Sequence, residues 1–256
     1  MVIREDYVDF GMLDGIVRIM TNSNSKRRDY FLPASILIAA VLVSGAVIYN
    51  AGKGTGEPEK AAVPVNTNNP AANVAAVTAD DHISGSLGAQ ITIVEFSDLE
   101  CPFCKGFHET MQRIVDDYDG QVAWVYRHFP LDNLHSKARK EAEATECAGE
   151  LGGNEGFWRY IDRLFEITPS NDGLDLSLLP QIAEDVGLNR ADFELCLESG
   201  KYANHIEADY QDAVQSGGQG TPYSVVITND GEYQTIPGAL PYERIKLYID
   251  EVLASQ

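Results

Sequence analysis

Apolar and polar residues follow strand-like and helix-like patterns in turn along residues 82–256. Gln90–Ser97 is rich in apolar residues and predicts a buried strand, and Pro102–Tyr118 places apolar residues three and four positions apart, which predicts an amphipathic helix. The β-rich run Gln121–Tyr126 predicts a second strand. A helical pattern then extends over about 136–216, with breaks at glycine-containing positions.

Strand character returns in the last part of the chain. Tyr223–Thr228 and Glu232–Ile236 are β-rich runs, and the Asn-Asp-Gly segment 229–231 between them is typical of a tight hairpin turn. Pro241–Leu253 predicts a closing amphipathic helix. The order is therefore β-α-β, a helical block and β-β-α. This order predicts an α/β fold with a mixed sheet, helices on its faces and the helical block as an insertion.

The N-terminal part of the chain has a different pattern. Residues 31–49 carry no charge, and as a helix they span about 28 Å, close to the hydrocarbon thickness of a bilayer. Three basic residues at 26–28 precede this run, and few follow it. The positive-inside rule therefore predicts a single-pass cell-membrane anchor, with a short cytoplasmic segment at 1–30 and the rest of the chain on the outer, periplasmic or extracellular side.

A cleaved signal peptide is the alternative, because small residues at 44–46 could form a cleavage region. The length of the apolar run and of its N-terminal flank favours the uncleaved anchor. Residues 50–81 are rich in Ala, Pro, Asn, Gly and Thr and predict a disordered linker. A globular domain is therefore expected at 82–256, tethered to the membrane.

The net charge of −20 is carried entirely by residues 80–256, because the acidic and basic residues of 1–79 balance. Phosphate repels a domain with such an excess of carboxylates, so no nucleic-acid partner is expected. The same excess keeps a domain soluble, and it also attracts basic client proteins.

Two cysteines lie where the first predicted strand meets the first predicted helix. Cys101 and Cys104 enclose a Pro-Phe dipeptide, and this spacing puts both sulfurs within one helical turn, so that they can form and break an internal disulfide. The first sulfur lies at the positive end of the helix dipole, where the thiolate is favoured. Because the thiolate is the attacking species in disulfide exchange, this layout indicates a dithiol redox site.

Four segments of the chain together resemble the DsbA-type thiol-disulfide oxidoreductases of the thioredoxin superfamily. They are IVEFSDLECPFCKGFH at 91–108, YRHFPL at 126–131, Gly220-Thr221-Pro222 before the hairpin, and Gly238-Ala239 before the last helix. The resemblance covers residues 82–254. It implies a thioredoxin fold with a helical insertion at about 136–216.

The resemblance also implies roles for five residues. Cys101 is expected to be the exposed nucleophile, and Cys104 the buried partner that closes the disulfide. Pro222 matches the family's cis-proline, beside which a client backbone pairs, and Thr221 would present its backbone to the client. Glu95 matches a buried acid that moves protons to and from Cys104. No cofactor beyond the redox-active disulfide is implied.

The other two cysteines, Cys147 and Cys196, fall in two predicted helices of the insertion. Leftover cysteines in an oxidising compartment usually pair, so our hypothesis is a structural disulfide, with two buried free thiols as the alternative. Zinc would need four ligands, and the chain has no second C-x-x-C, although His108 follows Cys104 by four residues. No metal site is therefore expected.

The chain departs from the strongest oxidants of the family at two positions. Phe103 stands where strongly oxidising members carry histidine, and phenylalanine cannot favour the thiolate as a cation does. Thr221 stands where the strongest oxidant has valine. The resemblance therefore leaves the oxidising strength open.

The function that these features favour is extracytoplasmic oxidation of exported client proteins with free thiols. A quinone-linked membrane partner, as in related systems, would reoxidise the enzyme. A disulfide reductase or isomerase of the same fold is the alternative. A redox-inert binding or chaperone module, tethered to the membrane, is the third.

Overall fold

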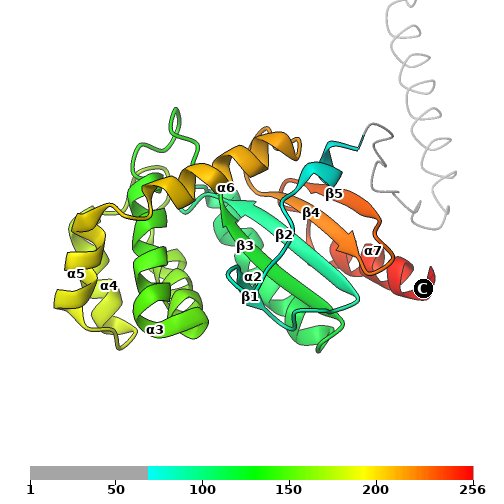
Figure 1. The fold of residues 1–256 in the computed structure, drawn as a ribbon, viewed down its shortest axis with the longest axis horizontal. Coiled ribbons are helices and arrows are strands. Elements are labelled where there is room, and N and C mark those ends of the chain that lie inside the picture. Colours follow the sequence, from blue (N-terminus) through cyan, green and yellow to red (C-terminus); the bar gives the residue numbers. More distant parts are fainter. Residues whose placement is uncertain (1–68, 256) are drawn as a thin grey trace, which may run out of the picture. The chain divides into compact units, whose positions relative to one another are not determined.

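A five-stranded mixed sheet runs through residues 69–255, the part of the chain that the computed structural model describes (Figure 1). The strands lie in the order β1-β3-β2-β4-β5; β2 and β3 are parallel, and the other neighbours are antiparallel. The strands are β1 (His82–Ser84), β2 (Ile91–Ser97), β3 (Val122–His128), β4 (Tyr223–Thr228) and β5 (Tyr233–Pro237). The four predicted strands are present, whereas β1 was not predicted, because three residues are too few to show an alternating pattern.

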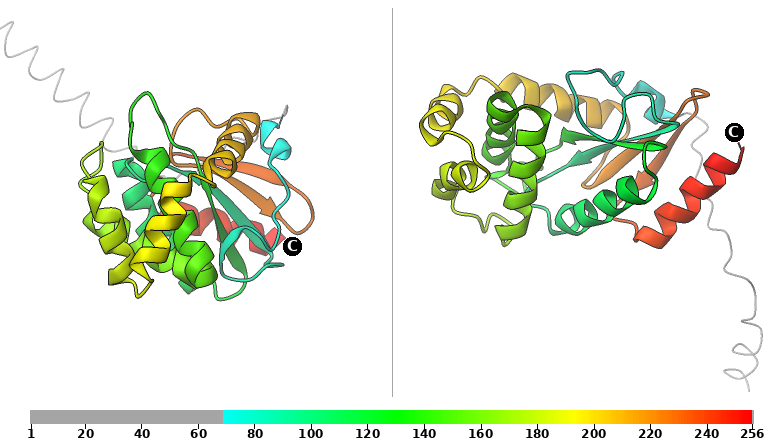
Figure 2. Two further views of the ribbon diagram at one scale, coloured as in Figure 1. Left: turned by 60° about the vertical axis from the view of Figure 1, so that its left-hand side comes forward. Right: turned by 90° about the horizontal axis from the view of Figure 1, so that it is seen from below.

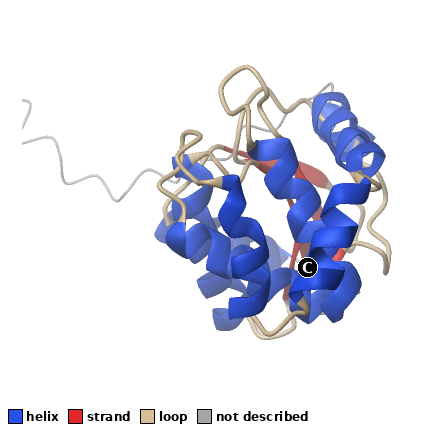
Figure 3. Cartoon of the chain, turned by 90° about the vertical axis from the view of Figure 1, so that its left-hand side faces the viewer, coloured by secondary structure: helices blue, strands red, loops and turns tan. Residues whose placement is uncertain are grey.

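Helices cover both faces of the sheet and one of its ends (Figure 2). α2 and α7 lie side by side on one face, and α6 lies with the short 3-10 helix η1 on the other. α3, α4 and α5 are grouped at one end of the sheet (Figure 1), and Figure 3 is viewed toward this end. The helices are η1 (Pro70–Asn73), α2 (Pro102–Asp117), α3 (Ala138–Ile167), η2 (Leu176–Leu178), α4 (Leu179–Asp185), α5 (Arg190–Ser199), α6 (Ala203–Gln215) and α7 (Tyr242–Ser255).

The alternation of side chains along β2 explains how two cores form. Ile91 and Ile93 belong to the larger core, with α2, α7 and the insertion, whereas Val94 and Phe96 belong to the smaller core, with α6 and η1. Successive side chains of a strand point to opposite faces, so Glu95 lies on the same face as Ile93. The strand pattern therefore places a carboxyl group on the side of the larger core.

The helical insertion consists of α3 to α6 and lies between β3 and β4, as predicted. α3 is interrupted at Gly153, whose φ of 65° lies outside the helical region. α5 ends at Gly200, whose φ of 61° forms a left-handed cap that favours glycine. A disulfide joins Cys147 on α3 to Cys196 on α5, with Cα atoms 5.8 Å apart, which is the pairing hypothesised from the sequence.

Residues 69–81 lie within the segment predicted as a linker, yet they pack on the domain. Ala71 and Val74 are buried in the smaller core, and the Asn69 side-chain amide donates to the Tyr233 carbonyl at 2.8 Å. The folded part of the chain therefore begins by residue 69 and not at residue 82. The alanine-rich composition resembles a linker, but two small apolar residues are sufficient to cover the sheet next to α6.

Three predicted segments lie outside the described residues. They are the cytoplasmic segment 1–30, the membrane helix 31–49 and the linker residues 50–68. Among residues 69–255, no helix combines the length and the apolarity that a membrane span requires. The membrane anchor therefore stays a prediction.

Arg127 on β3 anchors the N-terminal segment of the domain. Its buried guanidinium donates to Asp81 Oδ1 at 2.8 Å, to Asp212 Oδ2 at 2.6 Å and to the Ala75 carbonyl at 3.0 Å. Burial lowers the pKa of Arg127, but the hydrogen bond and charges of these carboxylates raise it overall. One buried cation thus joins β3, α6 and the segment that precedes β1.

We expect the Arg127→Met substitution to lower the free energy of unfolding by about 3–5 kcal/mol, because it leaves the largely covered carboxylates of Asp81 and Asp212 without their cation. Urea unfolding followed by circular dichroism measures this loss. Arg159→Met is the matched control, since Arg159 pairs with Glu155 at the surface and such pairs contribute about 0–1 kcal/mol. Equally small losses in both variants would show that the network does not stabilise the fold.

Reduction of the Cys147–Cys196 disulfide is expected to lower the free energy of unfolding by roughly 4 kcal/mol. The reason is that the bond, across a sequence separation of 49, restricts the unfolded chain. A Cys101→Ala/Cys104→Ala variant isolates this bond, and urea unfolding with and without dithiothreitol measures the difference. An unchanged unfolding midpoint after reduction would mean that packing alone holds α5 on α3.

Candidate redox active site

Cys101 is the N-cap residue of α2, just after the chain leaves β2. Pro102 occupies the first position of the helix, where its missing N–H and fixed φ are tolerated. The Cys101 N–H donates to the Asp98 carbonyl at 3.1 Å, and the Lys105 N–H donates to the Cys101 carbonyl at 3.1 Å. The turn after β2 therefore places Cys101 at the positive end of the helix and Cys104 within its first turn.

Both of these cysteines are free thiols, and both are buried. Cys104 has no exposed surface, as the resemblance implied, but Cys101 exposes only 5% of its own. The expectation of an exposed nucleophile is thus corrected, because the loop at Thr221 lies against this thiol. The Cys101 thiol donates to the Thr221 carbonyl at 3.5 Å, and the Thr221-Pro222 peptide bond has the expected cis form.

Hydrogen bonds to the Cys101 sulfur lower its pKa to about 6, well below the ordinary thiol value of 9.0. The largest contribution comes from the Cys104 thiol. Burial opposes the shift, whereas Thr221 and the backbone of Phe103 and Cys104 add to it. Burial raises the pKa of Cys104 well above its ordinary value, and the hydrogen bond and charge of Cys101 raise it further. These shifts favour the thiolate form of Cys101 and the protonated form of Cys104.

Glu95 lies next to this pair without any exposed surface. Its Oε2 accepts a hydrogen bond from the Trp124 indole N–H at 2.9 Å, and its Oε1 has no hydrogen-bond partner. Burial raises the pKa of Glu95 to about 8, although the Trp124 hydrogen bond and the nearby polar Ser97 side chain lower it, and the charge of Cys101 adds to the increase. The charge of Glu95 in turn raises the pKa of Cys104. The position fits the expected proton carrier, whose role stays a prediction.

Two polar residues next to the cysteines were missed in the sequence. The Asp98 N–H donates to Cys104 Sγ at 3.5 Å, and Asp98 Oδ2 lies 2.9 Å from His135 Nδ1. Both side chains are buried. A carboxylate directly after a buried strand and before a C-x-x-C is a signal that could have pointed to Asp98. His135 is 37 residues away in sequence, so only the fold brings it to this position.

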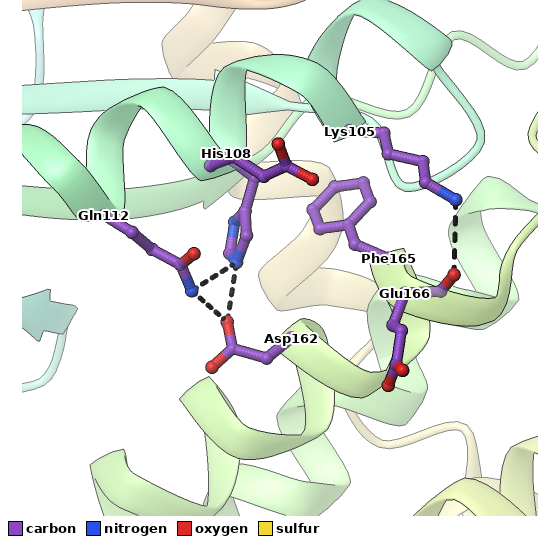
Figure 4. A pocket seen from close by; sticks show the side chains of 7 residues that line it. Lys105, His108, Gln112, Asp162, Phe165 and Glu166 are labelled. Carbon is purple, nitrogen blue, oxygen red and sulfur yellow. Dashed lines mark hydrogen bonds and ion pairs between the residues drawn. The ribbon is translucent and has the colours of Figure 1, made fainter.

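His108, weighed above as a metal ligand, is buried and engaged elsewhere. Its Nε2 lies 2.6 Å from Asp162 Oδ1, and the Gln112 amide donates to the same oxygen at 2.8 Å (Figure 4). Together with Phe165, these side chains line a pocket of about 300 Å³ between α2 and α3. Within residues 69–255, no three or more His, Cys, Asp or Glu side chains are arranged to hold a metal ion.

An open groove of about 360 Å³ lies along the cis-proline loop. Thr221, Pro222, Tyr223 and Gly238 are among the residues that line it. Phe103, between the two cysteines, exposes 68% of its surface. The site therefore combines a stabilised thiolate, a protonated thiol partner and a groove along the loop whose Thr221 carbonyl contacts Cys101.

Known structures share the fold of this protein. DsbA2 from Pseudomonas aeruginosa is 31% identical in sequence, and its structure matches with a TM-score of 0.59 over 70% of this chain and 97% of DsbA2. A family model described as thioredoxin matches residues 77–251. The chain belongs to the DsbA-like thioredoxin superfamily. The fold is that of the DsbA-like thiol-disulfide oxidoreductases.

Further relatives of this DsbA-like protein are more distant or much longer. α-DsbA1 from Wolbachia pipientis (24% identity, TM-score 0.60, 70% of this chain and 94% of the other) and BdbD from Bacillus subtilis (24%, 0.59, 68% and 93%) share the fold. The Na(+)/H(+) antiporter NhaA 3 from Salinispora tropica is 34% identical over 142 residues, 56% of this chain. This DsbA-like protein spans only 21% of the antiporter's length.

As the pH is lowered, the reduced DsbA-like protein is expected to lose its thiolate absorbance with a midpoint near pH 6, because the pKa of Cys101 is about 6. Cys104→Ala is expected to raise this midpoint, since it removes the hydrogen bond that lowers the pKa most. Ultraviolet titration of both proteins after mild reduction measures the two values. A wild-type midpoint near 9.0, or equal midpoints in the two proteins, would contradict this assignment.

Proposed function

We propose that this protein introduces disulfides into exported proteins through the Cys101–Cys104 pair. The observation that carries the proposal is the pKa of Cys101, lowered to about 6 beside a buried Cys104. A stabilised thiolate stabilises the reduced enzyme, so the oxidised pair accepts electrons readily. Because the pKa in the folded state is depressed, this stabilisation is complete above the ordinary thiol value of 9.0 and is lost as the pH falls through about 6.

The reaction consists of two exchange steps. A client thiolate attacks Cys101 Sγ, the Cys101–Cys104 bond breaks, and its electron pair goes to Cys104, which takes a proton from Glu95. A second client thiolate then attacks the client sulfur of the mixed disulfide. The client disulfide forms, Cys101 leaves as a thiolate, and two electrons have passed from the client to the enzyme.

The client lies in the groove along the cis-proline loop. The Thr221 carbonyl accepts from the Cys101 thiol, and it becomes available to a client N–H once Cys101 is a thiolate or is bonded to sulfur. The exposed Phe103 gives an apolar contact beside the nucleophile. Both features suit an extended, unfolded client that exposes backbone and apolar side chains.

The catalytic domain works on the outer side of the cell membrane. This location is supported by the uncharged run 31–49 with basic residues before it. It is also supported by the Cys147–Cys196 disulfide, a kind of bond that persists in oxidising compartments. The partners are exported proteins with free thiols and a quinone-linked membrane protein that reoxidises the cysteine pair.

A reductase or isomerase with the same site is the second candidate. Phe103 favours it, because it places no cation between the cysteines. In that direction the Cys101 thiolate attacks a client disulfide, and Cys104 resolves the mixed disulfide. The same residues act in both directions, so the reduction potential decides between them.

The reduction potential of the Cys101–Cys104 pair, measured in the full-length protein against glutathione, tests the proposed direction. A value near about −120 mV, where strong oxidants lie, is the expected result, and a value near about −270 mV, where thioredoxin lies, would favour the reductase. Cys101→Ser is expected to abolish oxidation of a reduced, unfolded client. Thr110→Ala, an exposed change on the same helix, is the control and is expected to stay active. Activity retained in Cys101→Ser would overturn the mechanism.

A further inference from the structure

Asp98 is a buried carboxylate between the turn that carries the cysteines and the loop that precedes α3. Its side chain has no exposed surface. Oδ1 accepts from the Glu100 N–H at 2.8 Å, and Oδ2 accepts from the Leu131 N–H at 2.8 Å. The backbone N–H of Asp98 donates to Cys104 Sγ at 3.5 Å. A single residue therefore connects two loops to the buried sulfur.

His135 is the basic side chain beside this carboxylate. Its Nδ1 lies 2.9 Å from Asp98 Oδ2, and only 7% of its side chain is exposed. Burial lowers the pKa of His135, but the hydrogen bond and charge of Asp98 and the charges of Cys101 and Asp172 outweigh burial and raise it. The Cys101 thiolate thus stabilises the imidazolium, and the imidazolium stabilises the thiolate to the same extent.

Other titratable groups face this pair from several elements. They are Glu100 and Cys101 on the turn, Tyr126 on β3, Glu141 on α3 and Asp172 in the loop after α3. Burial raises the pKa of Tyr126 and of Glu141, and the charge of Asp98 raises both further. Both groups are therefore neutral near pH 7. The cation that compensates Asp98 comes from His135.

We propose that Asp98 and His135 are positioning residues of the redox pair. The backbone N–H of Asp98 points at the Cys104 sulfur, and the hydrogen bonds that the Asp98 carboxylate accepts hold the residue in this orientation. His135 neutralises the carboxylate and supplies the positive charge that Phe103 lacks. This inference rests on the proposed exchange chemistry at the cysteine pair, but it does not depend on the direction of electron flow.

The pair acts when the Cys101–Cys104 bond breaks. The client thiolate bonds to Cys101, and the electron pair of the broken bond goes to Cys104, which is a thiolate until it takes a proton. The Asp98 N–H donates to this sulfur while negative charge develops on it, as backbone amides do in oxyanion holes. An uncompensated carboxylate on the same residue would oppose that charge, so the amide needs His135 in order to be effective.

The test compares single and double charge-removing variants of the full-length protein. The quantity measured is the equilibrium constant of the Cys101–Cys104 pair with glutathione. His135→Asn keeps a hydrogen-bond donor for Asp98 but removes the cation. It is expected to make the pair about tenfold less oxidising, a shift of about 30 mV. Asp98→Asn/His135→Asn removes both charges and is expected to return the constant to within about twofold of wild type, since the two changes are coupled.

His128→Asn is the matched control. His128 is also a buried histidine next to a carboxylate, with its Nε2 3.0 Å from Glu146 Oε1, but it belongs to a different cluster, between β3 and α3. This control is expected to lower the free energy of unfolding and to leave the glutathione constant within about twofold of wild type. A purely structural role of His135 would make the two variants behave alike.

A second variant keeps the test decisive if the double variant does not fold. His135→Lys returns a positive charge, and it is expected to reverse most of the shift in the glutathione equilibrium constant that His135→Asn causes. An unshifted constant in His135→Asn, an equal shift in His128→Asn, or no recovery in His135→Lys would overturn the inference. A wild-type value near that of thioredoxin together with the expected shifts would overturn only the oxidase function.

Discussion

The chemistry of this protein depends on one hydrogen bond, from the Cys104 thiol to the Cys101 sulfur at the start of α2. It is the largest contribution to the lowered pKa of Cys101, and it exists only while Cys104 keeps its proton. Burial is what keeps that proton in place, because a thiolate is poorly solvated in the core. The packing of α2 against the sheet is therefore not separate from reactivity. It sets the protonation state of one sulfur and, through it, the charge of the other.

Two buried carboxyl groups lie beside this pair, and their surroundings give them different tasks. Burial raises the pKa of Glu95 to about 8, so this group is able to hold a proton for the sulfur near neutral pH. Asp98 is equally buried but lies 2.9 Å from His135, which compensates its charge. The expected task of Glu95 is to exchange protons, whereas the task proposed for Asp98 is to orient an amide. The presence or absence of one imidazole separates the two roles.

The helical insertion also shapes the site, because the loop at one of its ends reaches Asp98 and the loop at the other reaches Cys101. His135 lies just before α3, at the beginning of the insertion, and Thr221 lies just after α6, at its end. The Cys147–Cys196 disulfide holds the insertion together, and Arg127 ties α6 to β3 and to the segment before β1. The disulfide and the Arg127 ion pairs lie away from the redox cysteines, and they therefore keep both loops in position through the rest of the fold.

Local patterns in the sequence were sufficient for the strand before the C-x-x-C, for the helix after it and for the hairpin at 229–231, because these features depend on neighbouring residues. Motif resemblance pointed to the cis-proline and to a buried acid at Glu95. Only the tertiary structure showed that residues 69–81 fold onto the sheet, since Ala71 is buried by a surface distant in sequence. It also decided that Cys101 is covered and that His135 lies beside Asp98. Burial and charge compensation depend on distance in space, which local patterns do not encode.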